Sequence, residues 1–214
     1  MTHPCPAIPP HVGTRHRGLS LVEIAIGLAI VSMLMTMAVP SFTDWIRNAH
    51  IRATAESIQH GLIQARAESV RRNLSVRFQL TDTLDANCQL STSGKNWVMN
   101  LGTANTPAGA CDATPSSTTA PMVIQAVVAS NNQNVTVNAS QAVVGFDGLG
   151  RQIALTNPTT GLGGMTIDIA SSQGTCLSDG GTVRCLRITV SPAGQTRMCD
   201  PSMSGAAATS PTAC

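Results

Sequence analysis

A long apolar run near the amino terminus constrains this chain more than any other feature. Residues 19–39 read LSLVEIAIGLAIVSMLMTMAV, 21 residues with one charged side chain, Glu23. A helix rises about 1.5 Å per residue, so one of this length covers the roughly 30 Å of a bilayer's hydrocarbon core. The run therefore predicts a transmembrane helix over residues 19–40.

The charges around the run set its orientation. Arg15 and Arg17 precede it, and no acidic residue lies before Glu23. The chain has 13 Lys and Arg residues and 11 Asp and Glu residues, so 13 minus those two arginines leaves 11 basic residues against 11 acidic ones. Because basic residues stay on the cytoplasmic side of a span, we expect the domain that follows to lie outside the cytoplasm.

The apolar run has two simpler interpretations, a cleaved secretory signal and a plain membrane anchor. A cleaved secretory signal has an apolar core of about 7–15 residues before a small-residue cleavage site. This run is longer, and no A-x-A pattern precedes Pro40. A plain signal-anchored envelope protein explains everything except Glu23, because a carboxylate costs about 2.5–3.5 kcal/mol at the centre of a span and less near its end. The plain anchor stays open as an alternative in which Glu23 has no role.

The helical pattern continues beyond the run. From residue 42 to residue 72, apolar residues recur at helical spacing and charged residues occupy the other side. The pattern predicts an amphipathic helix over residues 41–74 that continues the span, with a bend at Pro40. Its apolar face needs a sheet to cover it.

After residue 74 the spacing of apolar residues becomes that of strands. Residues 75–80 alternate, and further strand-like runs cover residues 97–101, 122–128, 143–146, 152–155, 165–170, 184–190 and 195–199. Turn-rich stretches separate these runs. One long helix followed by antiparallel strands is an α+β plan, so we expect a sheet domain over residues 75–200 and a small, polar tail over residues 201–214.

Six of the seven cysteines follow the apolar run, and no CxxC motif occurs among them. An even number of cysteines is typical of a domain exported to an oxidising compartment. Six cysteines allow fifteen connectivities. We favour the sequential set because each bond closes a local loop, and the last one ties the tail back through Cys214: Cys88–Cys111, Cys176–Cys185 and Cys199–Cys214.

Catalytic patterns are missing from the sequence. Histidines occur only at positions 3, 11, 16, 50 and 60, and there is no G-x-S-x-G, H-E-x-x-H or P-loop pattern. The glycines at 145–150 and 161–164 are not followed by helical patterns, so they predict turns and not phosphate-binding loops. We expect no enzyme activity, no cofactor and no metal site.

The residues around the start of the run carry a family resemblance. Residues 17–23, RGLSLVE, followed by the apolar span, resemble the class III signal of type IV pilins and type II secretion pseudopilins. The resemblance implies a leader over residues 1–18, cleavage by a prepilin peptidase after Gly18, and methylation of the new amino terminus on Leu19. It also implies a helix bend at Pro40. An ammonium on Leu19 has the Glu23 carboxylate four residues on, on its own chain or on a neighbour, so Glu23 is the candidate assembly residue.

Two runs in the sheet domain are similar to the GspH/FimT group of minor pilins and pseudopilins. They are residues 143–151, VVGFDGLGR, and residues 187–199, RITVSPAGQTRMC. The resemblance implies the type IV pilin fold and a structural role as a minor type IV pilin of the FimT/FimU kind, at the pilus tip or in its priming complex. A GspH-type pseudopilin of a type II secretion system is the alternative. The implied partners are the prepilin peptidase, other pilins or pseudopilins and inner-membrane lipid, with the sheet domain in the periplasm before assembly.

DNA is the other partner that the resemblance brings in. FimT-like minor pilins carry a basic G-R-x-R motif in the closing hairpin, whereas residues 194–197 here read GQTR. Arg184, Arg187 and Arg197 remain as candidate DNA contacts. Almost no aromatic residues are available for stacking, and the domain has no net positive charge, so we expect any such binding to be weak and sensitive to salt.

Overall fold

The computed structural model describes residues 20–102, 107–203, 210 and 212–214, with residues 37–41 described as helical backbone only. The chain divides into two compact units, Met1–Phe42 and Thr43–Cys214. The expected leader over residues 1–18, including Gly18, and the expected methylation position Leu19 lie outside the described residues.

One helix, α1 (Leu21–Arg72), runs through both units and contains 52 residues. The Ser20 carbonyl accepts hydrogen bonds from the backbone N–H groups of Glu23 at 3.0 Å and Ile24 at 3.2 Å, which starts the helix. The helix ends at Asn73, whose φ of 51° lies in the left-handed region. Leu74 N–H then donates to the Ser69 carbonyl at 3.2 Å, the bond that closes a Schellman motif.

The helix of the first unit exposes its apolar side chains. Leu21 is 83% exposed and Leu28 is 65% exposed. Among the described residues, no helix is both long enough and apolar enough to cross a membrane. Of the expected span over residues 19–40, residue 19 and the side chains of residues 37–40, including Pro40, are not described.

The second unit contains two larger antiparallel sheets and a small hairpin. The first sheet has the order β3 (Val123–Val128), β2 (Asn96–Leu101), β1 (Val76–Thr81), β5 (Val143–Phe146) and β6 (Gln152–Ile153). The second sheet has the order β11 (Thr196–Cys199), β10 (Leu186–Val190), β9 (Met165–Ser171) and β4 (Val135–Ala139). The hairpin pairs β7 (Leu155–Thr156) with β8 (Thr159–Thr160). Two short 3₁₀ helices complete the unit, η1 (Leu177–Asp179) and η2 (Pro201–Met203).

The expected α+β plan of one long helix and antiparallel strands is confirmed, with differences in detail. Strand β4 lies where no strand was expected, and the hairpin of β7 and β8 extends into a stretch expected to be a turn. The strand expected over residues 152–155 is divided between β6 and β7. The strands also form two larger sheets instead of one.

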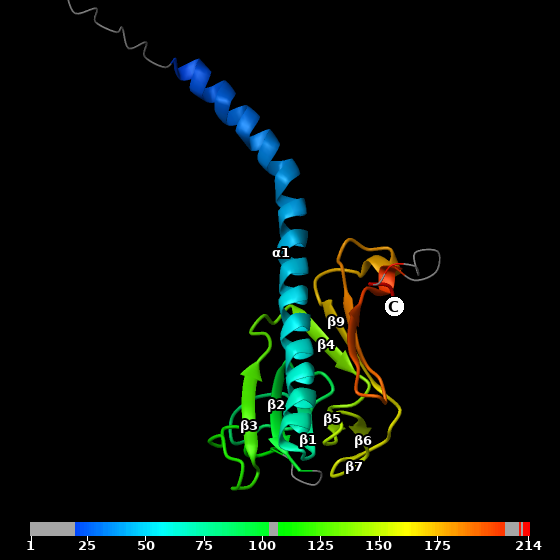
Figure 1. Cartoon of the computed structure of the whole chain (residues 1–214). Coiled ribbons are helices and arrows are strands. Elements are labelled where there is room, and N and C mark those ends of the chain that lie inside the picture. Colours follow the sequence, from blue (N-terminus) through cyan, green and yellow to red (C-terminus); the bar gives the residue numbers. More distant parts are fainter. Residues whose placement is uncertain (1–19, 103–106, 204–209, 211) are drawn as a thin grey trace, which may run out of the picture. The chain divides into compact units, whose positions relative to one another are not determined.

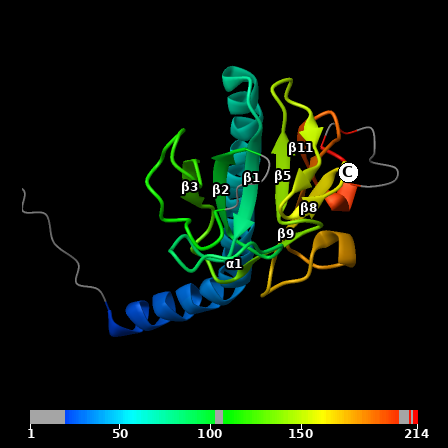
Figure 2. The ribbon, with the colours of Figure 1, turned by 90° about the horizontal axis from the view of Figure 1, so that it is seen from below.

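The core of the second unit lies between α1 and both sheets. Figures 1 and 2 show the second-unit part of α1 along one face of the sheet that contains β1 and β2. Its buried face consists of residues one turn apart: Ile51, Ala55, Ile58, Leu62 and Ala65. They join apolar residues of both sheets in one cluster. The apolar face of the helix therefore packs on the sheets from Ile51 to Ala65, whereas Phe42, Trp45 and Val70 of the expected pattern are exposed.

Helix and sheet approach each other most closely at Gly61. A Cβ atom there would lie 2.7 Å from the ring of Phe78 and 2.9 Å from that of Trp97. The two rings pack on each other with their centroids 5.6 Å apart. The Trp97 indole N–H donates to the Ser57 hydroxyl of α1 at 3.3 Å, which satisfies the one polar group of this contact.

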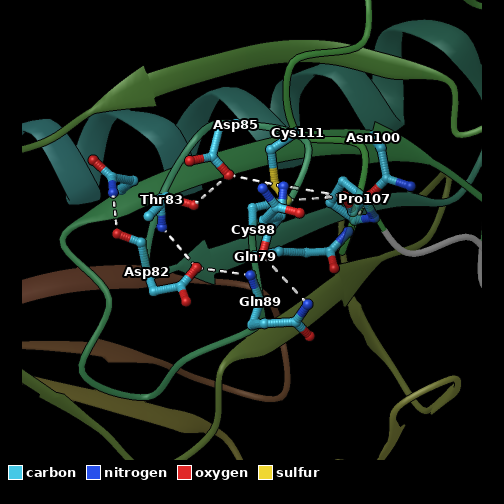
Figure 3. Close-up of a disulfide and its surroundings, with 11 residues drawn as sticks. Gln79, Asp82, Thr83, Asp85, Cys88, Gln89, Asn100, Pro107 and Cys111 are labelled. Atoms are coloured by element: carbon cyan, nitrogen blue, oxygen red, sulfur yellow. Dashed lines mark hydrogen bonds between the residues drawn. A yellow bond between two sulfur atoms is a disulfide. The ribbon is translucent and has the colours of Figure 1, made fainter.

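The opposite face of the first sheet is also buried, but under a polar layer. Arg77 and Gln79 of β1 are fully buried there, and burial lowers the pKa of Arg77 to about 10. Gln79 Nε2 donates to Asn100 Oδ1, and Asn100 Nδ2 donates to the Pro121 carbonyl at 3.2 Å. Two loops that the Cys88–Cys111 disulfide joins cover this face, one between β1 and β2 and the other between β2 and β3 (Figure 3).

Three disulfides join the six cysteines of the second unit. They are Cys88–Cys111, Cys176–Cys185 and Cys199–Cys214, with Cα–Cα distances of 6.1, 5.4 and 5.1 Å. These are the bonds of the sequential pairing that the loop argument favours. The last disulfide holds the tail beside β11. Asp200 N–H donates to the Thr212 carbonyl at 2.7 Å, and Asp200 and Ala213 form a parallel β-bridge.

Candidate functional site

The first turn of α1 holds the acid that the sequence singles out. Glu23 is exposed, and its neighbours Leu21, Val22, Ile24 and Ile26 are 83%, 63%, 50% and 57% exposed. The carboxylate thus lies in an apolar helical surface. The partial positive charge at a helix amino terminus favours an acid in the first turn.

No ion pair to Glu23 occurs within the part of the chain that the structure describes. The ammonium expected to meet this carboxylate belongs to Leu19, which lies outside that part. An exposed acid in an otherwise apolar helix surface can bind a cation from its own chain or from a neighbouring molecule.

The two runs that resemble the GspH/FimT group meet at the end of α1. The turn after β5 and the turn between β10 and β11 pack so closely that a Cβ atom on Gly194 would overlap the Gly150 carbonyl oxygen. Gln152 N–H donates to the Pro192 carbonyl at 3.0 Å, which joins the two turns. Arg66 of α1 donates from Nε to the same Gly150 carbonyl at 2.9 Å. The runs therefore form one structural unit with the helix.

Asp147 builds the first of these turns. Its Oδ1 accepts the backbone N–H groups of Leu149 and Arg151, both at 2.9 Å. Its Oδ2 pairs with the Arg151 guanidinium at 3.1 Å. Burial alone would raise the pKa of Asp147, but these hydrogen bonds favour the ionised form, so the pKa of this carboxyl is lowered. The turn that the glycines at 145–150 predict is therefore held by hydrogen bonds to Asp147.

The closing hairpin carries two of the three candidate DNA contacts. Arg187 pairs with Cys199 and Thr189 with Arg197 across β10 and β11, so the two arginines share one face of the sheet. The Arg187 side chain forms an ion pair with Asp168 of β9 and donates from Nε to Oδ1 at 2.6 Å and from Nη2 to Oδ2 at 3.1 Å. The hydrogen bond to Asp168 raises the pKa of Arg187.

Arg197 and Arg184 also have acceptors in the chain. Arg197 Nη2 donates to the Ala213 carbonyl at 2.8 Å. Arg184 Nε lies 3.0 Å from Asp200 Oδ2, and the Arg184 backbone N–H donates to Asn48 Oδ1 of α1 at 2.8 Å. Arg184 thus lies beside the helix, whereas Arg187 and Arg197 lie on one face of the hairpin. The structure brings two of the three candidates together and bonds all three to its own acceptors.

Within the described residues, no group of three or more His, Cys, Asp or Glu side chains could hold a metal ion. His50 and His60 lie on α1, ten residues apart. His50 lines a small cleft beside Arg47, Asn132 and Gln173, without a second histidine.

A helix laid on antiparallel sheets, with an apolar first segment that carries one acid, defines a structural subunit of the pilin class. Comparison with known families then gives the closer assignment. The model of the GspH family, described as type II transport protein GspH, matches residues 54–194, which is 141 of the 214 residues. The chain belongs to the GspH family, and its role is that of a minor pilin or pseudopilin. Family and fold are those of structural subunits.

Solved structures give a weaker likeness. Two crystal structures of the type IV minor pilin FimU of Pseudomonas aeruginosa, strain PAO1, are 18% identical to this chain, with TM-scores of 0.42 and 0.39. Each alignment covers 69% of this chain and 87% or 90% of FimU. No curated protein sequence matches significantly.

Proposed function

We propose that the chain is a minor type IV pilin of the FimT/FimU kind, made as a precursor and built into a filament through α1. Prepilin peptidase cleaves after Gly18, Leu19 becomes the methylated amino terminus, and the mature subunit joins the tip or priming complex of the pilus. The observation that carries the proposal is the position of Glu23, an acid in the first turn of an exposed apolar helix, five residues after Gly18.

The chemistry of assembly follows from that position. Cleavage leaves an ammonium on Leu19, which needs an anionic partner once lipid or neighbouring helices exclude water. Unpaired charges in such surroundings cost several kcal/mol each, so a register that leaves the ammonium or Glu23 alone is strongly disfavoured. The pair therefore selects one stagger between neighbouring subunits.

Before assembly, residues 19–40 anchor the subunit once in the inner membrane. The exposed apolar surface from Leu21 to Met35 supports this part of the proposal, and Arg15 and Arg17 keep the leader in the cytoplasm. The sheet domain then lies in the periplasm, an oxidising compartment that suits its three disulfides.

Pro40 gives the helix a point at which it can bend. Proline lacks a backbone N–H, so the helix loses one hydrogen bond, to the carbonyl four residues earlier. Ser32 and Thr36 hydroxyls each donate to the carbonyl three residues before them at 2.8 Å, a bond that also bends helices.

The second candidate is a GspH-type pseudopilin of a type II secretion system, which the description of the matching family favours. The two candidates share processing and mode of assembly. Deleting the gene separates them: loss of surface pili and twitching with normal enzyme secretion supports the minor pilin, and the converse supports the pseudopilin. DNA binding through Arg184, Arg187 and Arg197 is not part of the proposal, because only Arg187 and Arg197 share a face of the sheet and almost no aromatic residues are available for stacking.

The Glu23 side chain provides the direct test of assembly. We expect Glu23→Ala to remove the subunit from sheared filaments, because the Leu19 ammonium would lose its partner, while cellular levels of the subunit stay normal. Glu23→Asp, which keeps the charge, is the matched control and should retain part of the incorporation. Immunoblots of the filament and cell fractions measure both. Equal incorporation of Glu23→Ala and the natural chain would contradict the proposal.

A further inference from the structure

A groove of about 690 Å³ lies in the second unit, between residues 45–52 of α1 and the strands β10 and β11. Its apolar lining comes from the helix and the two strands, with Ala49, Leu186 and Met198. Two disulfide-closed segments supply the rest of the wall: Leu177 from the Cys176–Cys185 loop and Met203 from the tail closed by Cys199–Cys214.

Two large apolar side chains of the lining are open to solvent. Trp45 is 65% exposed and Leu177 is 42% exposed. Exposed tryptophan and leucine beside an apolar hollow are typical of surfaces that bind protein segments. The lining also has a buried polar part. The side chain of Asp200 is only 6% exposed and accepts hydrogen bonds from the backbone N–H and the hydroxyl of Ser202.

The lining carries two basic residues and one acidic residue, so 2 minus 1 leaves a formal charge of +1. Asp200 is buried and faces Arg184, so its charge is compensated inside the chain. The side chains of Arg184 and Arg52 are 54% and 75% exposed. Arg52 also bonds Glu56, which is not part of the lining, but an exposed helical pair of this kind is weak and exchanges readily. Both guanidinium groups therefore retain donors for an incoming carboxylate.

The wall formed by the Cys176–Cys185 loop is held by contacts within the second unit. In the Cys176–Cys185 loop, Leu177 N–H donates to the Val183 carbonyl at 2.8 Å. Gly181 lies so close to Thr175 that a Cβ atom there would overlap the Thr175 carbonyl. A wall that is already ordered loses little conformational entropy when a ligand binds.

We propose that this groove binds a segment of a partner protein that presents a bulky apolar side chain next to an acidic one. The apolar side chain packs between Trp45 and Leu177, and the carboxylate binds Arg52 and Arg184. The apolar lining and the single aromatic ring suit a peptide better than nucleic acid, which needs a row of stacking rings. The proposal does not depend on cleavage at Gly18 or on the pairing of Glu23.

Photo-crosslinking in the native cells tests the groove on the full chain. Benzoylphenylalanine in place of Leu177 should crosslink, after irradiation, to a peptide of another protein that contains Asp or Glu near the crosslinked residue. Leu149, which is 70% exposed and outside the groove, is the matched control position. Mass spectrometry identifies the peptides, and the same samples report whether residues 1–18 have been removed.

Charge reversal makes the test specific. Arg52→Glu should lower the Leu177 crosslink at least about tenfold, because a repelled carboxylate at an interface costs several kcal/mol, whereas Arg52→Lys should keep most of it. Changing the mapped acid of the partner to Lys should restore the Arg52→Glu crosslink. A crosslink to a second copy of this chain, to nucleic acid, to a peptide without an acid, to no protein, or one that Arg52→Glu leaves unchanged would overturn the proposal. Normal processing in those samples would leave the proposed function standing.

Discussion

Single residues decide how the sheet domain closes around the end of α1. Gly194 has a φ of +76°, in the left-handed region that side chains disfavour, and a Cβ atom there would overlap the Gly150 carbonyl. That carbonyl already accepts the bond from Arg66. The two turns and the helix therefore share one crowded point, and glycine is required there for both its backbone conformation and its size.

We expect Gly194→Ala to lower the free energy of unfolding by about 2–4 kcal/mol, from backbone strain together with the clash. Gly163, which has no atom within 4 Å of an added Cβ, is the matched control. Gly163→Ala should change the free energy of unfolding by less than about 0.5 kcal/mol. Urea unfolding of the full chain in detergent measures both variants. Equal effects of the two substitutions would contradict this account of the turns.

The hydrogen bonds of Asp82 lead us to expect that the free energy of unfolding depends on pH in the acid range. Its Oδ1 accepts the backbone N–H groups of Gln89 and Thr83, both at 2.7 Å (Figure 3). The hydrogen bond from Gln89, more than any other cause, lowers the pKa of this carboxyl. A carboxyl whose pKa is lowered in the folded state contributes stability above its unfolded pKa of about 4, and the contribution is lost as the pH falls through the folded pKa.

The variant Asp82→Asn should accordingly be less stable than the natural chain at pH 7, with a difference that shrinks as the pH falls below about 4. Urea midpoints between neutral and acid pH measure the difference. Asp112→Asn, a change at an exposed position in the loop between β2 and β3, is the control and should follow the natural chain throughout. A gap between Asp82→Asn and the natural chain that stays constant with pH would rule out this role for the carboxylate.

At the scale of elements, the sequence predicted those that have their own periodicity or turn signal. The helix and strands such as β1 and β9 follow from the spacing of apolar residues, and the turn after β5 follows from its glycines. Strand β4 was missed because residues 129–142 are dominated by Ser, Asn and Gln. Yet Val135, Val137 and Ala139 alternate with polar residues there and face the core, so the signal was present over five residues.

Other elements depend on contacts that no local pattern contains. The division of the strands into two larger sheets depends on which strands pair across the core. The polar layer around Arg77 is buried under the two loops that the Cys88–Cys111 bond joins. The ion pairs of Arg184 and Arg187 join residues 16 and 19 positions apart. For the same reason the groove beside Trp45, built from a helix, two strands and two loops, was not predicted.

The three disulfides should differ in their effect on stability. In the chain-entropy model a bond stabilises more when it closes a longer loop, and the sequence separations are 23, 15 and 9 for Cys88–Cys111, Cys199–Cys214 and Cys176–Cys185. Replacing each pair by serine should cost about 3.5, 3 and 2.5 kcal/mol in that order. Thermal unfolding of the three double variants measures the order, and the largest loss from Cys176–Cys185 would contradict it.

At the scale of the whole molecule, the chain combines a helical segment with an exposed apolar surface and a domain that has its own core. The second unit buries a helix face against two larger sheets and contains three disulfides, and the residues of its core all come from this unit. The first unit exposes apolar side chains and one acid. This division suits a subunit that is held by its helix and presents its domain to other molecules.

The most direct test of the central claim is intact mass spectrometry of the protein taken from the filament or membrane fraction. We expect a chain that begins at Leu19, carries one added methyl group and retains all three disulfides. Gly18→Val, which places a bulky side chain at the cleavage position, should leave the precursor uncut. A native protein that still carries residues 1–18 would contradict the assignment of Glu23 as the partner of a new amino terminus.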